Sequence, residues 1–273
     1  MVIKEFADLK NKVAFVTGGS GVIGGSMAES LAQADMKVVL TYRTGEATLE
    51  KAKSLNDAGM QAMAVRVDVL DEESVKRAME EVIQKWGKIH VLVNAAGGHV
   101  PGTIIPPDKS VFDASLEGIK KVLDLNLFGT VIPTLVIGRE MAKQGFGSII
   151  NISSMASSHS ITRVLGYSMA KAGIDIFTKW MAMEVATKYG DGIRVNAIAP
   201  GFFISTQNRD VLIDKDGKYT ERAEKIVAKT PMRRFGNPKE LNGIIHYLAS
   251  DASQFVTGTV IPVDGGFSSY SGV

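Results

Sequence analysis

Four polar residues have the types and the order that proton transfer requires. Tyr167 and Lys171 are four residues apart in the sequence Tyr-Ser-Met-Ala-Lys, which places them on one face of a predicted helix. Ser154 lies 13 residues before Tyr167, at the end of a predicted strand, and Asn126 lies in the preceding long helix. We therefore predict that Asn126, Ser154, Tyr167 and Lys171 form one catalytic site.

These residue types suit the exchange of a proton with a substrate oxygen. A tyrosine hydroxyl has an unperturbed pKa of about 10 and is a poor base at neutral pH. The positive charge of Lys171 is expected to stabilise the tyrosinate and to lower that pKa. Tyr167 then exchanges the proton, and Ser154 hydrogen-bonds the same oxygen. Asn126 is in a position to anchor a water that passes protons to Lys171.

A glycine-rich turn, Thr-Gly-Gly-Ser-Gly-Val-Ile-Gly at 17–24, follows the first predicted strand. Glycines allow a tight turn and a close approach to phosphates, and the N-terminal amides of the next helix donate to anions. Such turns also occur for packing reasons, so the position after the first strand is what favours a dinucleotide site. The residues predicted to bind the cofactor here are Gly18, Ser20, Gly21, Val22, Ile23 and Gly24.

The second predicted strand ends in Thr41-Tyr42-Arg43-Thr44, with no acidic residue before Glu46. An acid at this point would bind the ribose 2′-hydroxyl of NAD, whereas an arginine accommodates the 2′-phosphate of NADP. We therefore favour NADP(H), with NAD(H) as the alternative, and predict that Arg43 contacts the cofactor. The other interpretation is that Arg43 is an exposed loop residue.

Two further strand ends are expected at the same site. Asp68 can accept a hydrogen bond from the adenine amino group, or it can cap the helix that begins near Glu72. The small residues after the fourth strand leave room for a flat ligand against the backbone. The cofactor contacts predicted from these two strand ends are Asp68, Val69, Asn94, Ala95 and Gly97.

Short β-branched runs alternate with longer amphipathic stretches, which is the pattern of a parallel sheet with crossover helices. The predicted strands are Val13–Val16, Val38–Thr41, Ala62–Val67, Val91–Asn94, Ser148–Ile152, Arg194–Ala199 and Val260–Val263. The predicted helices are Ile23–Ala34, Glu46–Ala58, Glu72–Trp86, Leu116–Lys143, Leu165–Tyr189 and Lys239–Ala249. Pro133 is expected to kink the fourth helix.

The segment from about 202 to 235 breaks this alternation with aromatics, charges and the turn-like sequence Asp-Lys-Asp-Gly at 214–217. It is long for a connection, and long connections are often functional lids, so we predict a substrate lid there. Without a repeat or linker, residues 1–273 are predicted to form a single α/β domain, a doubly wound sheet of the Rossmann type.

Composition excludes several classes of function. The chain has 273 residues, of which 45% are hydrophobic, enough for one large core. Its net charge is only +2, which gives no global field for nucleic acid. It has no cysteine, and its four histidines lack metal-ligand spacing, so no metal is expected. No apolar run approaches about 18 residues, so we expect no membrane partner and a cytoplasmic protein.

Together these motifs resemble the short-chain dehydrogenase/reductase family over almost the whole chain: the glycine-rich turn, Asn-Ala-Ala-Gly at 94–97, Ser154 with Tyr167-xxx-Lys171, and Pro200-Gly201. The resemblance implies a seven-stranded parallel sheet, NAD(P)(H) as cofactor, a homotetramer and the acid–base roles given above. It also implies a subunit interface near 256–266. The cofactor contacts that it adds are Tyr167, Lys171, Pro200, Gly201, Phe203 and Ser205.

Within this family the chain is similar to the D-mannonate oxidoreductase (fructuronate reductase) branch in the sequences at 200–203 and 263–267 and in having Gly21 where the family usually has its glycine one residue later. That branch implies a keto-uronate, a sugar acid whose carboxylate needs a cation. Arginine suits this role, and the predicted substrate contacts are Ser154, Arg163 and Arg209.

Alternatives remain for these arginines and for the function. Arg163 is a loop residue in the competing interpretation, and Arg209 pairs with Asp210 or Glu221. Another sugar, gluconate or polyol dehydrogenase and a 3-ketoacyl reductase are the nearest competing functions. A dinucleotide-binding protein without catalysis is the remote one.

Overall fold

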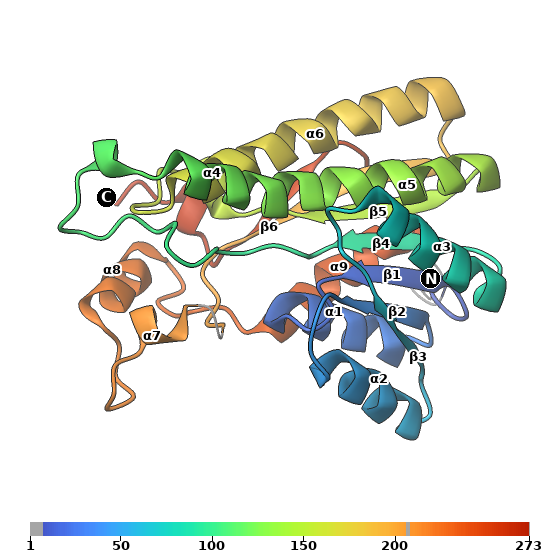
Figure 1. The fold of residues 1–273 in the computed structure, drawn as a ribbon, viewed down its shortest axis with the longest axis horizontal. Helices are drawn as coiled ribbons and strands as arrows, with labels where there is room; N and C mark the ends of the chain where they lie inside the picture. Colours follow the sequence, from blue (N-terminus) through green and yellow to red (C-terminus); the bar gives the residue numbers. More distant parts are fainter. Residues whose placement is uncertain (1–7, 206–207, 273) are drawn as a thin grey trace.

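The computed structural model describes residues 8–205 and 208–272, and its seven strands pair in one parallel sheet in the order β3-β2-β1-β4-β5-β6-β7 (Figure 1). The predicted α/β, doubly wound, seven-stranded sheet is confirmed. The strands are β1 (Val13–Thr17), β2 (Lys37–Tyr42), β3 (Gln61–Arg66), β4 (Val91–Asn94), β5 (Gly147–Ile152), β6 (Ile193–Pro200) and β7 (Val260–Val263).

Strand order determines where a ligand can bind. The chain runs outward from β1 to β3 in one direction and then from β4 to β7 in the other, so the order reverses between β1 and β4. These two strands pair in parallel, with Thr17 beside Asn94 at their carboxyl ends. Open α/β sheets bind ligands in the crevice at such a reversal. The glycine-rich turn and the residues after β4 therefore meet at the same edge of the sheet.

Helices cover both faces of the sheet and form two hydrophobic cores with it (Figure 1). One face packs against α1, α2 and α9, and the other against α3, α5 and α6. The helices are α1 (Val22–Gln33), α2 (Ala47–Asp57), α3 (Glu72–Trp86), α4 (Leu116–Leu123), α5 (Gly129–Gln144), α6 (Leu165–Tyr189), α7 (Arg209–Leu212), α8 (Glu221–Lys229) and α9 (Asn242–Ala249). The last predicted helix begins later than expected, because Pro238–Leu241 forms a 3-10 turn capped by Asn237.

The predicted fourth helix is interrupted one turn before Pro133. A π-helical turn, Asp124–Phe128, separates α4 from α5, and Pro133 lies inside α5. The side chain of Asn126 in this turn donates to the Val122 carbonyl at 2.9 Å, so it takes part in the helical hydrogen bonding. Of the described residues, only the run Leu116–Gln144 is long and apolar enough to cross a membrane, and it packs against α3 and α6 as a core helix does.

The segment at 202–235 is folded, although two of its residues, 206 and 207, lie outside the described part of the chain. It contains α7 and α8, and an isolated antiparallel β-bridge joins Ile213 to Tyr219. Leu212, Ile226 and Phe235 form a small hydrophobic cluster of their own. This separate cluster lets the segment stand apart from the main cores, over the carboxyl edge of the sheet (Figure 1).

Candidate active site

The first turn of α1 has the properties of a pyrophosphate cradle. Its N-cap, Gly21, offers no side chain to the helix amides, and the first turn contains no acidic residue. The amides there are therefore available to an anion, as helix N-termini that bind phosphate require. Gly18 has a φ of +68°, and a Cβ atom there would lie 2.7 Å from the Ala95 carbonyl oxygen. Only glycine therefore allows the turn after β1 to lie so close to the residues after β4. The tight turn and its available amides fit the dinucleotide that the sequence predicts.

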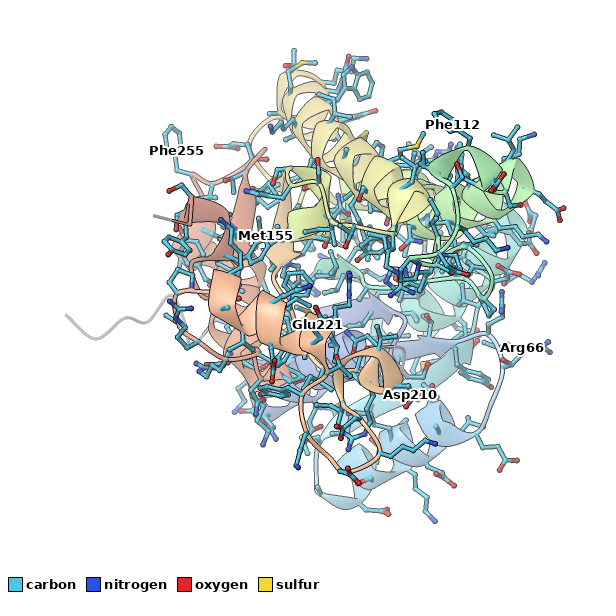
Figure 2. The ribbon with its side chains drawn as sticks, turned by 90° about the vertical axis from the view of Figure 1, so that its left-hand side faces the viewer. Arg66, Phe112, Met155, Asp210, Glu221 and Phe255 are labelled. Carbon is cyan, nitrogen blue, oxygen red and sulfur yellow. The ribbon has the colours of Figure 1, made fainter. Side chains whose placement is uncertain are left out.

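The predicted adenosine contacts lie outside the cavity described below, on the β2–β3 side of the crevice. Arg43 follows the end of β2 and is exposed. Arg66, at the end of β3, pairs in register with Tyr42 and extends toward solvent (Figure 2). Asp68 does not cap α3, because Asp71 does so by accepting from the Glu73 amide at 3.0 Å. Asp68 instead accepts from the Leu70 amide at 3.0 Å.

The side chain of Asn94 has a structural role. Its side chain is buried, and its amide donates to Thr134 at 2.8 Å and to Asn151 at 2.9 Å. The side chain therefore ties β4 to α5 and β5 and does not line the cavity, so the predicted cofactor contact of Asn94 would have to come from its backbone. Ala95 and Gly97, which follow Asn94, do line the cavity.

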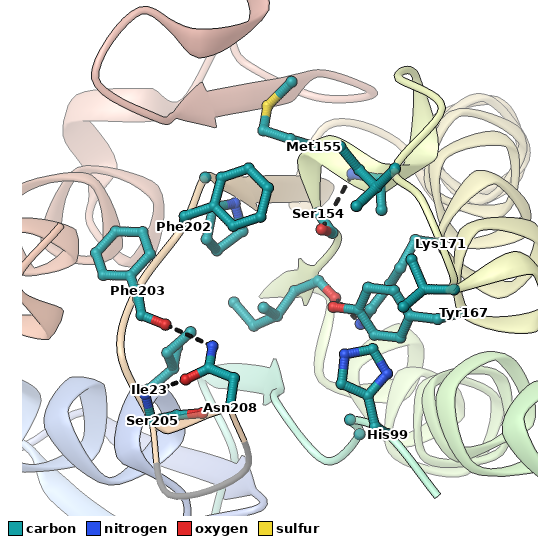
Figure 3. A pocket seen from close by; sticks show the side chains of 18 of the residues that line it. Ile23, His99, Ser154, Met155, Tyr167, Lys171, Phe202, Phe203, Ser205 and Asn208 are labelled. Carbon is teal, nitrogen blue, oxygen red and sulfur yellow. Dashed lines mark hydrogen bonds between the residues drawn. The ribbon is translucent and has the colours of Figure 1, made fainter. Parts of the chain in front are cut away.

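The three predicted proton-transfer residues at the β5–α6 junction come together as expected (Figure 3). The Ser154 hydroxyl accepts from the Ala156 amide at 3.1 Å and hydrogen-bonds Tyr167. The Lys171 ammonium is buried, donates to the Ile152 carbonyl at 2.7 Å and lies 5.4 Å from the centre of the Tyr167 ring. The end of β5 thus holds Ser154 against the first two turns of α6.

Asn126 reaches this group from the π-helical turn. It is fully buried, its oxygen accepts from the Gly98 amide at 2.8 Å, and its amide donates to the Gly98 carbonyl at 2.8 Å. A Cβ atom on Gly97 would lie 2.7 Å from the Asn126 oxygen and 3.7 Å from the Lys171 nitrogen. Gly97 therefore permits the loop after β4 to run between these two side chains, and Asn126 fixes that loop.

Burial changes the acidity of both titrating residues. It raises the pKa of Tyr167, and the hydrogen bond with Ser154 only opposes that rise. The expected lowering of the tyrosine pKa is therefore wrong, because desolvation of the phenolate outweighs the favourable contacts. Burial lowers the pKa of Lys171 to about 8, although the negative charge of Asp175 opposes this change. At neutral pH the site thus holds a protonated phenol beside an ammonium.

A cavity of about 290 Å³ opens from this group toward the 202–235 segment (Figure 3). Its walls include Ile23 from α1, Ser154 and Tyr167 from the catalytic group, and Phe203 from the segment after β6. The other predicted residues that line it are Gly21, Val22, Gly24, Ala95, Gly97, Arg163, Lys171, Pro200, Gly201 and Ser205. One cavity therefore joins the helix N-terminus, the catalytic group and the predicted lid.

His99 is a cavity residue whose role the sequence does not predict. Its ring centre lies 4.9 Å from that of Tyr167 (Figure 3). Burial lowers the pKa of His99, and the positive charges of Arg222 and Lys171 lower it further. A neutral imidazole can both donate and accept, as contacts with substrate hydroxyl groups require. The signal in the sequence is its position directly after the small residues that follow β4.

Two arginines line the far wall of the cavity. Arg163 has a φ of +76°, and its Nε donates to the Ile105 carbonyl at 3.1 Å, which leaves its terminal nitrogens for other contacts. Arg222, from α8, donates to the Thr162 hydroxyl at 2.9 Å. Burial lowers the pKa of Arg222, and so does the neighbouring charge of Arg163. In the described part of the chain, no acidic side chain forms an ion pair with Arg163 or Arg222.

Arg209 is not among the residues that line this cavity. It begins α7, is exposed, and shows no ion pair with Asp210 or Glu221 within the described residues. Neither prediction for Arg209 is supported, and the arginine of the 202–235 segment that lines the cavity is Arg222. The residue that closes the turn before α7 is Asn208, whose side chain accepts from the Ser205 amide at 2.7 Å and donates to the Phe203 carbonyl at 2.9 Å.

The geometry supports a reaction at a carbonyl or hydroxyl carbon. The chemistry that a nicotinamide supplies when bound is hydride transfer. Tyr167 donates the proton to a carbonyl oxygen, or accepts it in the reverse direction, and the Lys171 charge stabilises the tyrosinate. The Ser154 hydroxyl accepts from the Ala156 amide with one lone pair, which leaves its proton able to donate to the substrate oxygen. In residues 8–205 and 208–272, no cluster of three or more His, Asp or Glu side chains is placed to hold a metal.

Fold and site together define a nicotinamide-dependent oxidoreductase. The family model described as enoyl-(acyl carrier protein) reductase matches residues 19–268. The chain belongs to the short-chain dehydrogenase/reductase family, and it acts on alcohol or ketone groups as that family does. UxuB of Bacillus subtilis, an uncharacterised oxidoreductase, is 44% identical over 97% of this chain and 98% of its own.

Two solved structures show the same architecture. A candidate D-mannonate oxidoreductase from Haemophilus influenzae, crystallised with NAD, is 40% identical, with a TM-score of 0.89 over 98% of this chain and 99% of its own. A candidate gluconate dehydrogenase from Agrobacterium tumefaciens is 32% identical, with a TM-score of 0.87 over 97% of this chain and 98% of its own.

Proposed function

We propose that this enzyme interconverts a keto-sugar acid and its hydroxy acid, with D-fructuronate and D-mannonate as the pair. The observation that carries this proposal is the paired Arg163 and Arg222 in the wall of the catalytic cavity, with no acidic partner among the described residues. Two neighbouring positive charges disfavour each other, so an anion bound in the cavity would stabilise both. A uronate carries that anion on the same chain as its carbonyl.

The rest of the cavity agrees with a polyhydroxylated substrate. Ser154 and Tyr167 address the carbonyl oxygen, and the neutral His99 beside Tyr167 can both donate to and accept from a neighbouring hydroxyl. The similarity to a candidate D-mannonate oxidoreductase supports the same substrate. The similarity to a candidate gluconate dehydrogenase makes a related sugar acid the second candidate.

A substrate panel tests this proposal. Purified enzyme is offered D-fructuronate, D-mannonate, gluconate and its 5-keto acid, and a 3-ketoacyl thioester, each with NAD(H) and NADP(H). Nicotinamide absorbance reports turnover. We expect the highest kcat/KM with D-fructuronate in the reducing direction. A higher kcat/KM with the thioester would contradict the proposal, because a ketoacyl thioester has no carboxylate for the two arginines to bind.

We further propose that the enzyme prefers NADP(H). Arg43 and Arg66 supply positive charge at the ends of β2 and β3, where an NAD-specific enzyme needs an acid for the ribose hydroxyls. Changing Arg43 to Ala is expected to weaken NADP(H) binding by about 1.5–3 kcal/mol, as for a hydrogen bond to a charged group, and to leave NAD(H) binding almost unchanged.

Fluorescence titration of the two reduced cofactors measures this difference. The matched control is Arg77→Ala, which removes an exposed arginine from α3, away from the strand ends. Equal losses for both cofactors in the Arg43→Ala variant would show that Arg43 does not recognise the 2′-phosphate.

We also propose that the enzyme is a cytoplasmic homotetramer. Ile176, Trp180 and Met183 lie on one face of α6 and are all at least half exposed. Phe255, just before the 256–266 segment, is fully exposed, and it projects from the molecule on the side opposite Arg66 (Figure 2). Exposed apolar side chains grouped on a surface support a contact between subunits.

A further inference from the structure

A polar contact behind the catalytic group joins the end of β5 to α6. The hydroxyl of Ser153 donates to the carboxylate of Asp175. Ser153 is buried and directly precedes Ser154, and its amide donates to the Ile198 carbonyl at 2.8 Å. Asp175 is half-buried and follows Lys171 by one helical turn, on the same face of α6. The proton-transfer mechanism described above gives no role to this carboxylate.

We propose that Asp175 is a positioning residue, whose carboxylate keeps the Lys171 ammonium charged and ties the Ser153–Ser154 turn to α6. This inference depends only on the acid–base group of the family and not on which substrate the enzyme uses.

The surroundings of Lys171 show why a carboxylate matters there. The ammonium donates to a neutral acceptor, the Ile152 carbonyl, and is 4% exposed as a residue. The Tyr167 ring centre lies 5.4 Å from the ammonium, and the charge of Asp175 acts on it from the same helix. His99 and Asn126 are the neighbours from the loop after β4 and from the π-helical turn. Among these neighbours, the Asp175 carboxylate is the one whose charge favours the ammonium.

Burial already disfavours the ammonium, so the loss of one favourable charge is expected to matter. Burial lowers the pKa of Lys171 to about 8 even with Asp175 opposing the change. Removing the carboxylate lowers the pKa further, because an opposite charge then no longer favours the ammonium. Lys171 would then lose its proton near neutral pH, and the tyrosinate formed during the reaction would lose its support.

Four variants separate the effect of the Asp175 charge from the effect of its hydrogen bond with Ser153. Asp175→Asn keeps an oxygen that can accept from Ser153 but removes the charge, and Asp175→Glu keeps the charge. Ser153→Ala removes the hydrogen bond and leaves the carboxylate. Glu184→Gln is the matched control, because Glu184 lies further along the same helix and pairs with Lys188 at 2.7 Å, away from the site.

The measurement is the pH profile of kcat/KM for the panel compound that the wild-type enzyme turns over fastest. We expect Asp175→Asn to move the alkaline loss of activity down by about one pH unit or more, with little change in acid. Asp175→Glu and Glu184→Gln should retain the wild-type profile. Ser153→Ala should lower kcat at every pH without moving the alkaline limb.

Two results would overturn the inference. One is an Asp175→Asn profile that coincides with that of the wild type, or that moves no more than the Glu184→Gln profile. The other is an equal loss of activity at every pH in Asp175→Asn, since a tether without electrostatic action would give that result. If Asp175→Asn does not fold, an alkaline limb that moves in Ser153→Ala, whose carboxylate is intact, would overturn the inference as well.

Discussion

Replacing Tyr167 with Phe is expected to reduce turnover by a factor of roughly 10²–10⁴, the usual contribution of a positioned general acid or base. The tyrosine hydroxyl is the group that meets the substrate oxygen together with Ser154, and burial raises its pKa, so it enters carbonyl reduction as a protonated acid. Lys171 cannot replace it, because the ammonium is directed at the Ile152 carbonyl.

Cofactor affinity should change little in Tyr167→Phe, since the ring that packs on His99 remains. Steady-state kinetics gives the loss of kcat, and a fluorescence titration gives the affinity. The matched control is Tyr189→Phe, which alters an exposed tyrosine at the end of the same helix. Near-normal turnover in a correctly folded Tyr167→Phe protein would rule out the proton-transfer mechanism.

The protonation states of Tyr167 and Lys171 favour reduction of a carbonyl. In that direction Tyr167 starts as the protonated phenol and does not have to lose a proton first. A raised pKa of Tyr167 keeps the phenol protonated, and a Lys171 pKa of about 8 keeps the ammonium charged at neutral pH. Oxidation of a hydroxyl requires the tyrosinate and is therefore expected to become faster as pH rises, until Lys171 loses its charge. The two directions should differ in pH optimum for this reason.

The sheet could be predicted from the sequence because its strands are buried on both faces. Such strands are continuous runs of β-branched and apolar residues, as in Val91–Asn94, whose predicted bounds match β4, and in Val13–Thr17, where only the last residue was missed. The catalytic residues could be predicted because Tyr167 and Lys171 are one helical turn apart and Ser154 ends a strand. Spacing along one element is a local property, and the sequence shows it directly.

The remaining features depend on contacts between distant segments. The π-helical turn at Asn126 forms with a side chain that is bonded to Gly98, 28 residues away. Arg222 reaches the cavity because α8 docks on Thr162, 60 residues away, and no local pattern distinguishes it from the exposed Arg209. The structural role of Asn94 depends on distant contacts as well, since its side chain bonds to Thr134 and Asn151, 40 and 57 residues away.

Replacing Arg163 and Arg222 with Met is expected to reduce kcat/KM with a uronate strongly. Each arginine can form charge-assisted hydrogen bonds worth about 1.5–3 kcal/mol, which corresponds to a loss of roughly 10- to 100-fold in each single variant. Methionine keeps much of the apolar stem and removes the charge, so the wall of the cavity is retained. The double variant should lose less than the product of the single losses, because neighbouring charges that share one ligand are coupled.

An uncharged keto-sugar of the same length distinguishes recognition of the carboxylate from support of the fold. The arginine variants should use it about as well as the wild type does, since it has no carboxylate to lose. Arg209→Met is the control, because Arg209 is exposed outside the cavity wall, and this variant should retain activity with both compounds. If the Arg163→Met and Arg222→Met variants lose activity equally with the uronate and the uncharged sugar, the two arginines support the α8 segment and do not bind the carboxylate. The assignment of a keto-uronate as substrate would then lose its physical basis, while the proton-transfer mechanism at Tyr167 would be unaffected.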